Sequence, residues 1–236
     1  TVGPQEARAW TVHTGATAPE AAEQREAIRS AFTLKAGDRF TQADWSAAKA
    51  ASLRQLTAVH DLGRFERFVR LCAGRVGQLL NLSSLANDAG VSHSTAQAWM
   101  DLLQTSYIVH LLPPWFTNTG KRLVKSPKLY FYDVGLACWL LGLRSAEQVS
   151  RDPLWGGLFE NFIVMEALKD RFNQGEHAPL YFYRDSTGHE VDLLVPTRGR
   201  FRALEIKAGA TVNSDYFKGL QQFAKAHPDQ LDAGGV

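Results

Sequence analysis

The clearest hydrophobic pattern in the chain lies near its end, where two short apolar segments are separated by a turn. Residues 189–195 and 201–206 are rich in apolar and β-branched side chains, which predicts two strands. Residues 196–200 between them have turn composition, and Gly199 can adopt a positive φ. We therefore predict an antiparallel hairpin whose turn is centred on Arg198 and Gly199.

The register of this hairpin brings four charged side chains to one face. A turn centred on residues 198–199 sets Asp192 opposite Glu205 and Glu190 opposite Lys207, and strand alternation places all four together. Two facing carboxylates repel each other, and a divalent cation would remove the conflict. In the alternative interpretation, these are solvated charges of an exposed strand edge, with Asp192 paired to a nearby arginine. A one-residue register shift would separate Asp192 from Glu205 and exclude the metal site.

A second hydrophobic pattern predicts a buried helix. Residues 158–168 are apolar nearly all round, so Glu160 is expected inside the protein, where a carboxylate needs a partner. Asp152 and Pro153 offer a cap and a first-turn proline, although the glycines at 156–157 weaken the opening turns. In the alternative interpretation, Glu160 is a first-turn acid that the helix dipole favours.

Residues 82–99 have the pattern of two short helices joined by a glycine turn, the geometry of a helix-turn-helix. Ser92 is the expected cap of the second helix. The positions of this helix that we expect to pack inward are Ala96, Trp99, Met100 and Leu103. The positions that we expect to face outward, as candidate nucleic-acid contacts, are Ser92, His93, Ser94 and Gln97.

A predicted wing follows this pair of helices. Residues 107–112 are β-rich, and the basic stretch 121–128 follows them like the second strand of a wing. Lys121, Arg122 and Lys125 are suited to phosphate contacts, which carry little sequence information. The candidate recognition helix has no Lys or Arg at its exposed start, and winged helices also serve as docking or structural domains. DNA is the expected partner, with protein docking as the alternative.

The charged residues of the helix and the hairpin follow a definite order. Glu160 in the helix precedes Asp192 in the first strand, and Glu205-Ile206-Lys207 lies in the second strand. This order resembles the PD-(D/E)XK nuclease superfamily, with all four motif positions filled. The resemblance implies Mg²⁺- or Mn²⁺-dependent DNA hydrolysis, with Asp192 and Glu205 as metal ligands. It also implies that Glu160 completes the metal site or orients water, and that Lys207 stabilises the attacking hydroxide or the phosphate.

Longer segments extend the likeness. They are RQLTAVHDLGRFERFVRLCAGRVGQLLNLSSLANDAGVSHSTAQAWMDLLQTSYIVHLLPP, then GKRLVKSPKLYFYDVGLACWLLGL, then PLWGGLFENFIVMEALK, and YFYRDSTGHEVDLLV with LEIKAG. From about residue 54 to 225 the chain is similar to the domain of unknown function, family 4143, that follows the ATPase module of prokaryotic AAA-type ATPases. The similarity implies a winged helix, a nuclease-like domain, and an ATPase module or another protein as partner. No segment supplies the phosphate-binding pattern GxxxxGKS or GxxxxGKT, so we expect no ATP site in this chain.

The first part of the chain differs from the rest. The segment AIRSAFTLKAGDRFTQADWSAAKAASLRQL resembles part of a POTRA repeat of outer-membrane assembly factors, and taken literally it implies a periplasmic scaffold. No signal peptide is visible, and the longest apolar run, 134–143, is shorter than the roughly 20 residues of a membrane span, so we expect a cytoplasmic protein. The net charge of +2 is too small to indicate nucleic-acid binding by itself.

The sequence therefore predicts an α/β protein with three parts. They are an appendage over residues 1–53, a winged helix-turn-helix over 54–132, and a PD-(D/E)XK nuclease-like mixed sheet with flanking helices over 133–236. The expected function is metal-dependent phosphodiester hydrolysis on DNA. The alternative is a non-catalytic module that binds DNA or protein and works with an attached ATPase.

Overall fold

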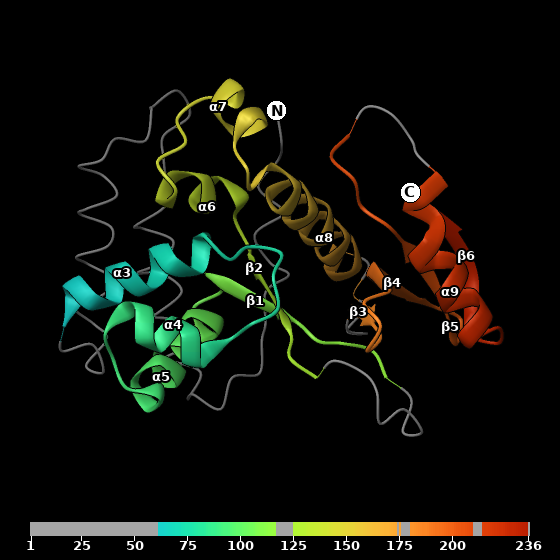
Figure 1. The fold of residues 1–236 in the computed structure, drawn as a ribbon, viewed down its shortest axis with the longest axis horizontal. Helices are drawn as coiled ribbons and strands as arrows, with labels where there is room; N and C mark the ends of the chain where they lie inside the picture. The colour runs from blue at the N-terminus through green and yellow to red at the C-terminus, as the bar shows by residue number, and fades with distance from the viewer. Residues whose placement is uncertain (1–60, 117–124, 174, 176–179, 210–213, 236) are drawn as a thin grey trace. The chain divides into compact units, whose positions relative to one another are not determined.

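The computed structural model describes residues 61–116, 125–173, 175, 180–209 and 214–235. The chain divides into two compact units, Thr1–Glu66 and Arg67–Val236. The predicted appendage, residues 1–53, lies outside the described residues, and so does the junction predicted after it. Helix α3 (Leu62–Ala73) spans the division, and the second unit holds all the other elements described below (Figure 1).

Helices α4 (Leu82–Ala89) and α5 (His93–Thr105) form where the sequence predicts them. Gly90 ends α4 with a φ of 74°, a conformation that costs glycine little. The Ser92 side chain accepts a hydrogen bond from the Thr95 amide at 3.1 Å, which confirms the predicted cap of α5. The four inward positions are also confirmed, because all of them are buried: Ala96, Trp99, Met100 and Leu103.

Two short strands follow α5. Strands β1 (Val109–Leu112) and β2 (Lys128–Phe131) pair antiparallel, and every residue of β2 is buried. The predicted second strand over 121–128 is wrong in its position, because residues 125–127 precede β2 and only Lys128 belongs to it. Residues 121–124 lie outside the described part of the chain.

The second sheet has four strands in the order β3-β4-β5-β6. The first three strands pair antiparallel and β6 pairs parallel to β5, so the sheet is mixed and the α/β class is confirmed. The bounds of these strands are Tyr181–Arg184, Glu190–Thr197, Arg200–Leu204 and Leu231–Gly235. The remaining elements are α6 (Val134–Leu140), α7 (Ala146–Arg151), α8 (Trp155–Asn173), the 3-10 helix η2 (Ser214–Phe217) and α9 (Lys218–Ala226).

The β4–β5 hairpin has the predicted register. Leu193 pairs with Leu204, and the strands turn through Arg198 and Gly199, both at positive φ (48° and 83°). Such a two-residue turn matches the twist of the strands that it joins. Extending the pairing by one residue sets position 192 opposite position 205, as predicted.

Backbone hydrogen bonds tie the two sheets together. The chain that continues β1 runs beside β3, where the Trp115 amide donates to the Phe182 carbonyl at 2.7 Å and the Phe182 amide donates to the Pro113 carbonyl at 3.1 Å. On the other side, the Gly77 amide donates to the Leu129 carbonyl of β2 at 2.8 Å. The first two bonds, together with the β1–β2 pairing, connect β2 to β3, whereas the Gly77 bond holds the segment after α3 against β2.

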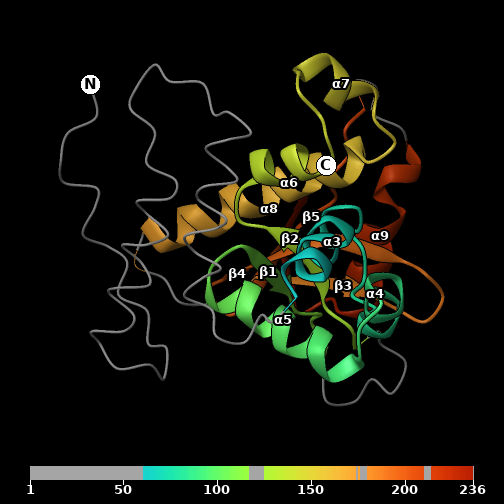
Figure 2. The same cartoon turned by 90° about the vertical axis from the view of Figure 1, so that its left-hand side faces the viewer.

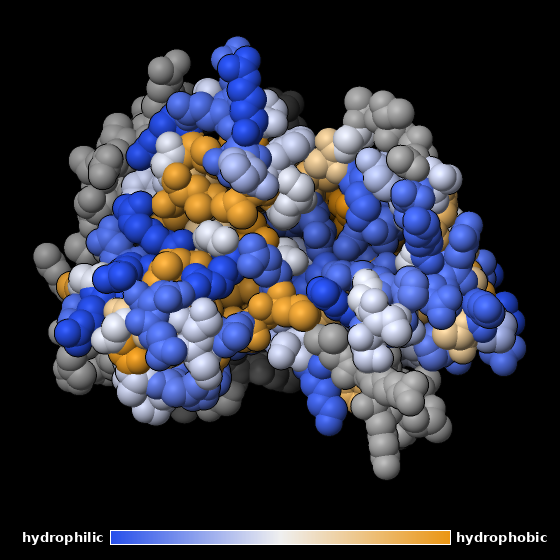
Figure 3. Space-filling view, in the orientation of Figure 1, coloured by the Kyte–Doolittle hydropathy of each residue, from blue (hydrophilic) through white to orange (hydrophobic). Residues whose placement is uncertain are grey.

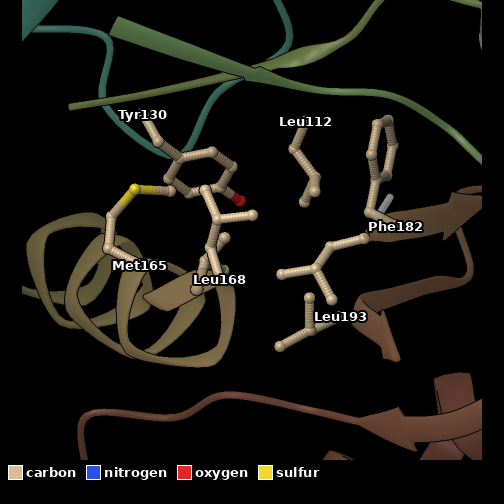
Figure 4. Close-up of a cluster of buried hydrophobic side chains, with 8 residues drawn as sticks. Leu112, Tyr130, Met165, Leu168, Phe182 and Leu193 are labelled. Atoms are coloured by element: carbon tan, nitrogen blue, oxygen red, sulfur yellow. The ribbon is translucent and has the colours of Figure 1, made fainter. Parts of the chain in front are cut away.

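One hydrophobic core fills the space between the sheets and α8. Figure 4 shows side chains of β2 and α8 converging with those of β1, β3 and β4. Burial of each large apolar side chain contributes about 2 kcal/mol to stability. The core residues are Leu112, Tyr130, Val164, Met165, Leu168, Leu180, Phe182 and Leu193.

Helix α8 is buried along one side rather than all round, which corrects the sequence prediction. Its buried positions recur at helical spacing, whereas Phe162 is 44% exposed and Glu166 is exposed. Helix α6 packs beside α8 (Figure 2). Figure 3 shows a more hydrophobic surface over α6 and a hydrophilic surface over α9 and β5. Among the described residues, no helix combines the length and apolarity that a membrane crossing requires.

Candidate functional site

A charged cavity of about 470 Å³ lies where β2, α8, β4 and the segment after β5 meet. Four carboxylates and three basic side chains line it, so its lining is acidic when all of them are ionised. The four residues predicted from the catalytic pattern are all present. The lining residues are Gly77, Gln78, Leu79, Lys128, Glu160, Arg184, Glu190, Asp192, Glu205 and Lys207.

One half of the site is built around the β4–β5 hairpin. Asp192 is only 5% exposed, and its Oδ2 accepts a hydrogen bond from the Ile206 amide at 2.8 Å. The Lys207 ammonium lies 2.5 Å from Glu205 Oε1 and 3.5 Å from Asp192 Oδ2. Glu205 Oε2 is buried and has no hydrogen-bond partner among the described residues. The alternative pairing of Asp192 with an arginine is wrong, because its cationic neighbours are lysines.

The electrostatics of this half are unusual for a surface hairpin. Burial, reinforced by the Asp192 charge, raises the pKa of the Glu205 carboxyl to about 7. Burial alone would lower the pKa of Lys207, but its contacts with Glu205 and Asp192 raise it, so the side chain stays an ammonium. Above the pKa of Glu205, where both carboxylates are ionised, the pair therefore carries more negative charge than Lys207 alone balances.

The other half of the site is centred on Lys128, the last residue of the basic stretch 121–128. Lys128 is only 3% exposed. Its Nζ lies 2.5 Å from Glu190 Oε1, 2.7 Å from Glu160 Oε1 and 3.3 Å from Asp192 Oδ1. Burial lowers the pKa of Lys128, but the three carboxylates outweigh burial and raise it above its ordinary value.

Glu160 has the buried surroundings that the sequence predicts, and its partners come from β2. Lys128 and Tyr130 lie two residues apart in the strand, so both side chains leave the same face and reach the Glu160 Oε1 atom. The Tyr130 hydroxyl donates to that oxygen at 2.5 Å. Burial raises the pKa of Glu160, although Lys128 opposes the shift. The sequence feature that could have indicated a buried role for Lys128 is its position as a charged residue at the start of an apolar strand.

Asn161 is a second residue that the sequence analysis missed. Its side chain is fully buried, donating to the Phe131 carbonyl at 2.8 Å and accepting from the Phe131 amide at 2.7 Å. This double hydrogen bond fixes α8 against β2 and so sets the distance between Glu160 and Lys128. The sequence feature that could have indicated Asn161 is a polar residue within an otherwise apolar helical segment.

Two glycines allow helices to approach the site closely. A Cβ atom on Gly157 of α8 would lie 2.7 Å from the Val76 carbonyl oxygen. A Cβ atom on Gly219 of α9 would lie 1.8 Å from the Glu190 carbonyl oxygen and 3.5 Å from Glu205 Oε2. Of the two glycines that weaken the first turn of α8, Gly157 is thus needed for the close packing of this helix against Val76.

Those predicted nucleic-acid contacts that the structure describes are not among the residues that line the cavity. Their positions on α5 are exposed as expected: Ser92, His93, Ser94 and Gln97. Gln97 donates to Asp101 Oδ1 at 2.8 Å, and α5 contains no Lys or Arg, so its exposed face offers little attraction for phosphate. Lys125 is exposed, whereas Lys121 and Arg122 lie outside the described residues.

The residues present fit a hard divalent cation at the hairpin half of the site. Within the described part of the chain, no three His, Cys, Asp or Glu side chains form a ready metal cage. Mg²⁺ needs no such cage, since one or two carboxylates with water and substrate oxygens are its usual ligands. Asp192 and Glu205 supply two carboxylates, and the unpartnered Glu205 Oε2 is the kind of oxygen that such an ion takes.

Comparison with known protein families divides the chain in two. A family described as "Domain of unknown function (DUF8612)" matches residues 27–147, and one described as "Domain of unknown function (DUF4143)" matches residues 155–236. The second match confirms the predicted likeness to family 4143 over the site-bearing hairpin. Residues 54–147, which that prediction also included, lie within the match to the other family.

Two curated relatives share part of this sequence. An uncharacterized protein of Mycobacterium bovis and another of Mycobacterium tuberculosis are each 38% identical to it over 135 residues. The shared region covers 57% of this chain but only 30% of each relative. Most of each relative therefore lies outside the shared region. No solved structure matches the chain significantly.

Proposed function

Because the chain belongs to the family described as domain of unknown function DUF8612, whose description assigns no activity, we propose its function from the site itself. The proposed function is hydrolysis of DNA phosphodiester bonds with bound Mg²⁺ or Mn²⁺. The observation that carries it is the convergence of Glu160, Asp192, Glu205 and Lys207 on one cavity, with a buried Glu205 oxygen left without a partner among the described residues.

Asp192 and Glu205 are the proposed metal ligands. Both are held in place, since the Ile206 amide bonds Asp192 Oδ2 at 2.8 Å and Lys207 bonds Glu205 Oε1 at 2.5 Å. Glu205 Oε2 is left buried and without a hydrogen-bond partner among the described residues. A divalent cation bound there would supply hydroxide at neutral pH and stabilise charge on the phosphate.

Lys207 and Glu160 are the other two residues that we place at the reaction. The Lys207 side chain is 34% exposed beside both carboxylates, so its ammonium can also donate to a phosphate oxygen at the cavity mouth. Glu160 lies across the cavity and is held by Lys128 and Tyr130. Its raised pKa suits it to orient the attacking water and to accept a proton from it.

We assign the finer architecture as part of the same proposal. Helices α4 and α5 with the β1–β2 pair form a winged helix-turn-helix, and β3–β6 with α8 and α9 form a PD-(D/E)XK-like domain. The exposed start of α5 and the basic stretch at Lys121, Arg122 and Lys125 are the proposed DNA contacts. The supporting observations are the capped turn at Gly90 and Ser92 and the exposure of these α5 positions.

A second candidate is a non-catalytic module that binds DNA or protein and works with an ATPase carried elsewhere. One observation favours it. Lys128 and Lys207 already balance much of the carboxylate charge, so the cluster is stable without a metal ion. Under this proposal the site is a structural ion-pair network between β2, α8 and β4.

A cleavage assay separates the two proposals. The chain is incubated with linear, circular and single-stranded DNA in Mg²⁺ or Mn²⁺, with EDTA as the metal-free condition. The proposed nuclease cleaves at least one DNA form, and EDTA abolishes the cleavage. Asp192→Asn and Glu205→Gln keep the size of each side chain but remove a metal ligand, and we expect each to lower the rate by about 100-fold or more.

The matched control is Glu166→Gln, which removes a carboxylate from the exposed face of α8. It should cleave like the wild type. DNA binding without metal-dependent cleavage would support the non-catalytic module, and equal cleavage by the wild type and Asp192→Asn would show that the activity arises at another site.

A further inference from the structure

Lys128 lies deeper in the site than any other basic side chain of its lining. Its side chain is 4% exposed, compared with 34% for Lys207 and 37% for Arg184. Three carboxylates from two elements surround its ammonium, Glu160 of α8 together with Glu190 and Asp192 of β4. A buried ammonium needs such partners, and these carboxylates in turn need a cation.

The backbone holds this ammonium where it is. The Leu129 carbonyl accepts from the Gly77 amide at 2.8 Å, and the Leu129 amide donates to the Gln78 carbonyl at 3.0 Å. The other edge of β2 pairs with β1. A strand bonded on both edges cannot withdraw its side chain without breaking the core, and withdrawal would leave three carboxylates together without a counter-ion.

Lys128 Nζ occupies the point on which three carboxylates converge. Carboxylates of Glu160, Glu190 and Asp192 each lie within 3.3 Å of this nitrogen. With the ammonium in place the cluster is not a metal site, but without it the three carboxylates would offer oxygen ligands of the kind that Mg²⁺ or Mn²⁺ takes. Asp192 faces both halves of the site, with Oδ1 toward Lys128 and Oδ2 toward Lys207.

We infer that the Lys128 ammonium stands in the place of a second divalent cation, so that the site takes a single Mg²⁺ or Mn²⁺, on its Asp192–Glu205 side. The prediction of one ion at Asp192 and Glu205 rests on the proposed function. The prediction that Lys128 excludes an ion from its own side of the site does not depend on that function. Lys128 is therefore a positioning residue that holds Glu160 and Glu190 in place without contacting the substrate.

The test is the number of Mn²⁺ ions bound per chain, measured by equilibrium dialysis with EPR detection of unbound Mn²⁺. The full chain is compared as wild type, Lys128→Met and Lys225→Met. Lys128→Met keeps the length of the side chain but frees three carboxylates, and we expect it to bind one ion more than the wild type. Lys225→Met removes an exposed lysine of α9 and should bind as the wild type does.

Each outcome decides the inference. Two ions in the wild type, or equal numbers in the wild type and a folded Lys128→Met, would overturn it. No ion in the wild type but one in Lys128→Met would support the role of Lys128 while refuting the proposed metal-dependent function. Adding Glu190→Gln to Lys128→Met should weaken the extra site at least tenfold. If Lys128→Met unfolds in the absence of metal, Mn²⁺ should restore its circular dichroism spectrum, and failure to restore it would overturn the inference.

Discussion

At the scale of single residues, the described chain buries polar groups whose contribution can be measured separately from function. The most informative ones lie close to β2, where the two sheets and α8 meet. Asn161 satisfies both backbone groups of Phe131, and His110 has a buried ring nitrogen with no hydrogen-bond partner among the described residues. The Asn161 contacts stabilise the fold, and the buried His110 ring makes the free energy of unfolding depend on pH.

We predict that Asn161→Ala lowers the free energy of unfolding by about 2–4 kcal/mol, because it leaves a buried amide and a buried carbonyl without partners. Urea denaturation measures this decrease. The control is Asn87→Ala on the exposed surface of α4, which should change the free energy by less than about 1 kcal/mol. Equal effects of the two substitutions would show that α8 is not fixed to β2 through Asn161.

Burial lowers the pKa of His110 to about 4. Between its ordinary pKa of about 6.5 and pH 4, the unfolded chain binds a proton that the folded chain does not. The His110 contribution to stability is therefore present above pH 6.5 and disappears as the pH falls toward 4, by up to about 3 kcal/mol. Urea denaturation across this range should show that His110→Phe lacks this pH dependence and that the exposed control His93→Gln retains it.

At the scale of elements, the hairpin could be predicted from sequence and the placement of β2 could not. The β4–β5 register depends on local features, namely strand alternation and a turn at Arg198 and Gly199. Lys128 pairs with residues that are 32 and 64 positions away. Its local context, a basic stretch, indicated the surface, whereas long-range pairing of β2 decided its burial.

The start of α8 offers a matched pair of glycines. A Cβ on Gly156 meets nothing within 4 Å, whereas a Cβ on Gly157 would lie 2.7 Å from the Val76 carbonyl oxygen. We predict that Gly156→Ala raises the melting temperature, through a gain of up to about 1 kcal/mol in helix stability. Gly157→Ala should lower the melting temperature, since α8 must move away from Val76. A stabilising Gly157→Ala would contradict the close packing of α8 beside the site.

At the scale of the whole molecule, the site joins parts that the sequence analysis assigned to different domains. Lys128 comes from the predicted winged helix, and its partners Glu160 and Asp192 come from the predicted nuclease-like domain. The pattern of Glu160, Asp192, Glu205 and Lys207 was sufficient to predict that these four residues lie at one site. The position of Lys128 between Glu160 and Asp192 could not be predicted, because no short motif encodes a contact between distant elements.

The proposed DNA-binding residues give a prediction at this scale. Replacing Lys121, Arg122 and Lys125 together by alanine should weaken DNA binding and flatten its salt dependence. The slope of log K against log salt should fall in magnitude by about 0.9 for each phosphate that the variant no longer neutralises. Fluorescence anisotropy over a series of salt concentrations measures the slope. Lys169→Ala, at an exposed position of α8, is the control and should leave the slope unchanged. An unchanged slope in the triple variant would exclude this stretch from DNA binding.

The most direct test of the central claim is calorimetric titration of Mn²⁺ into the full chain at about pH 8, above the pKa of Glu205, where its carboxylate is ionised. We predict saturable binding by the wild type, weakened at least tenfold in Glu205→Gln and unchanged in the exposed control Glu166→Gln. Absence of saturable binding in the wild type, or equal binding by Glu205→Gln, would contradict the assignment of Asp192 and Glu205 as metal ligands.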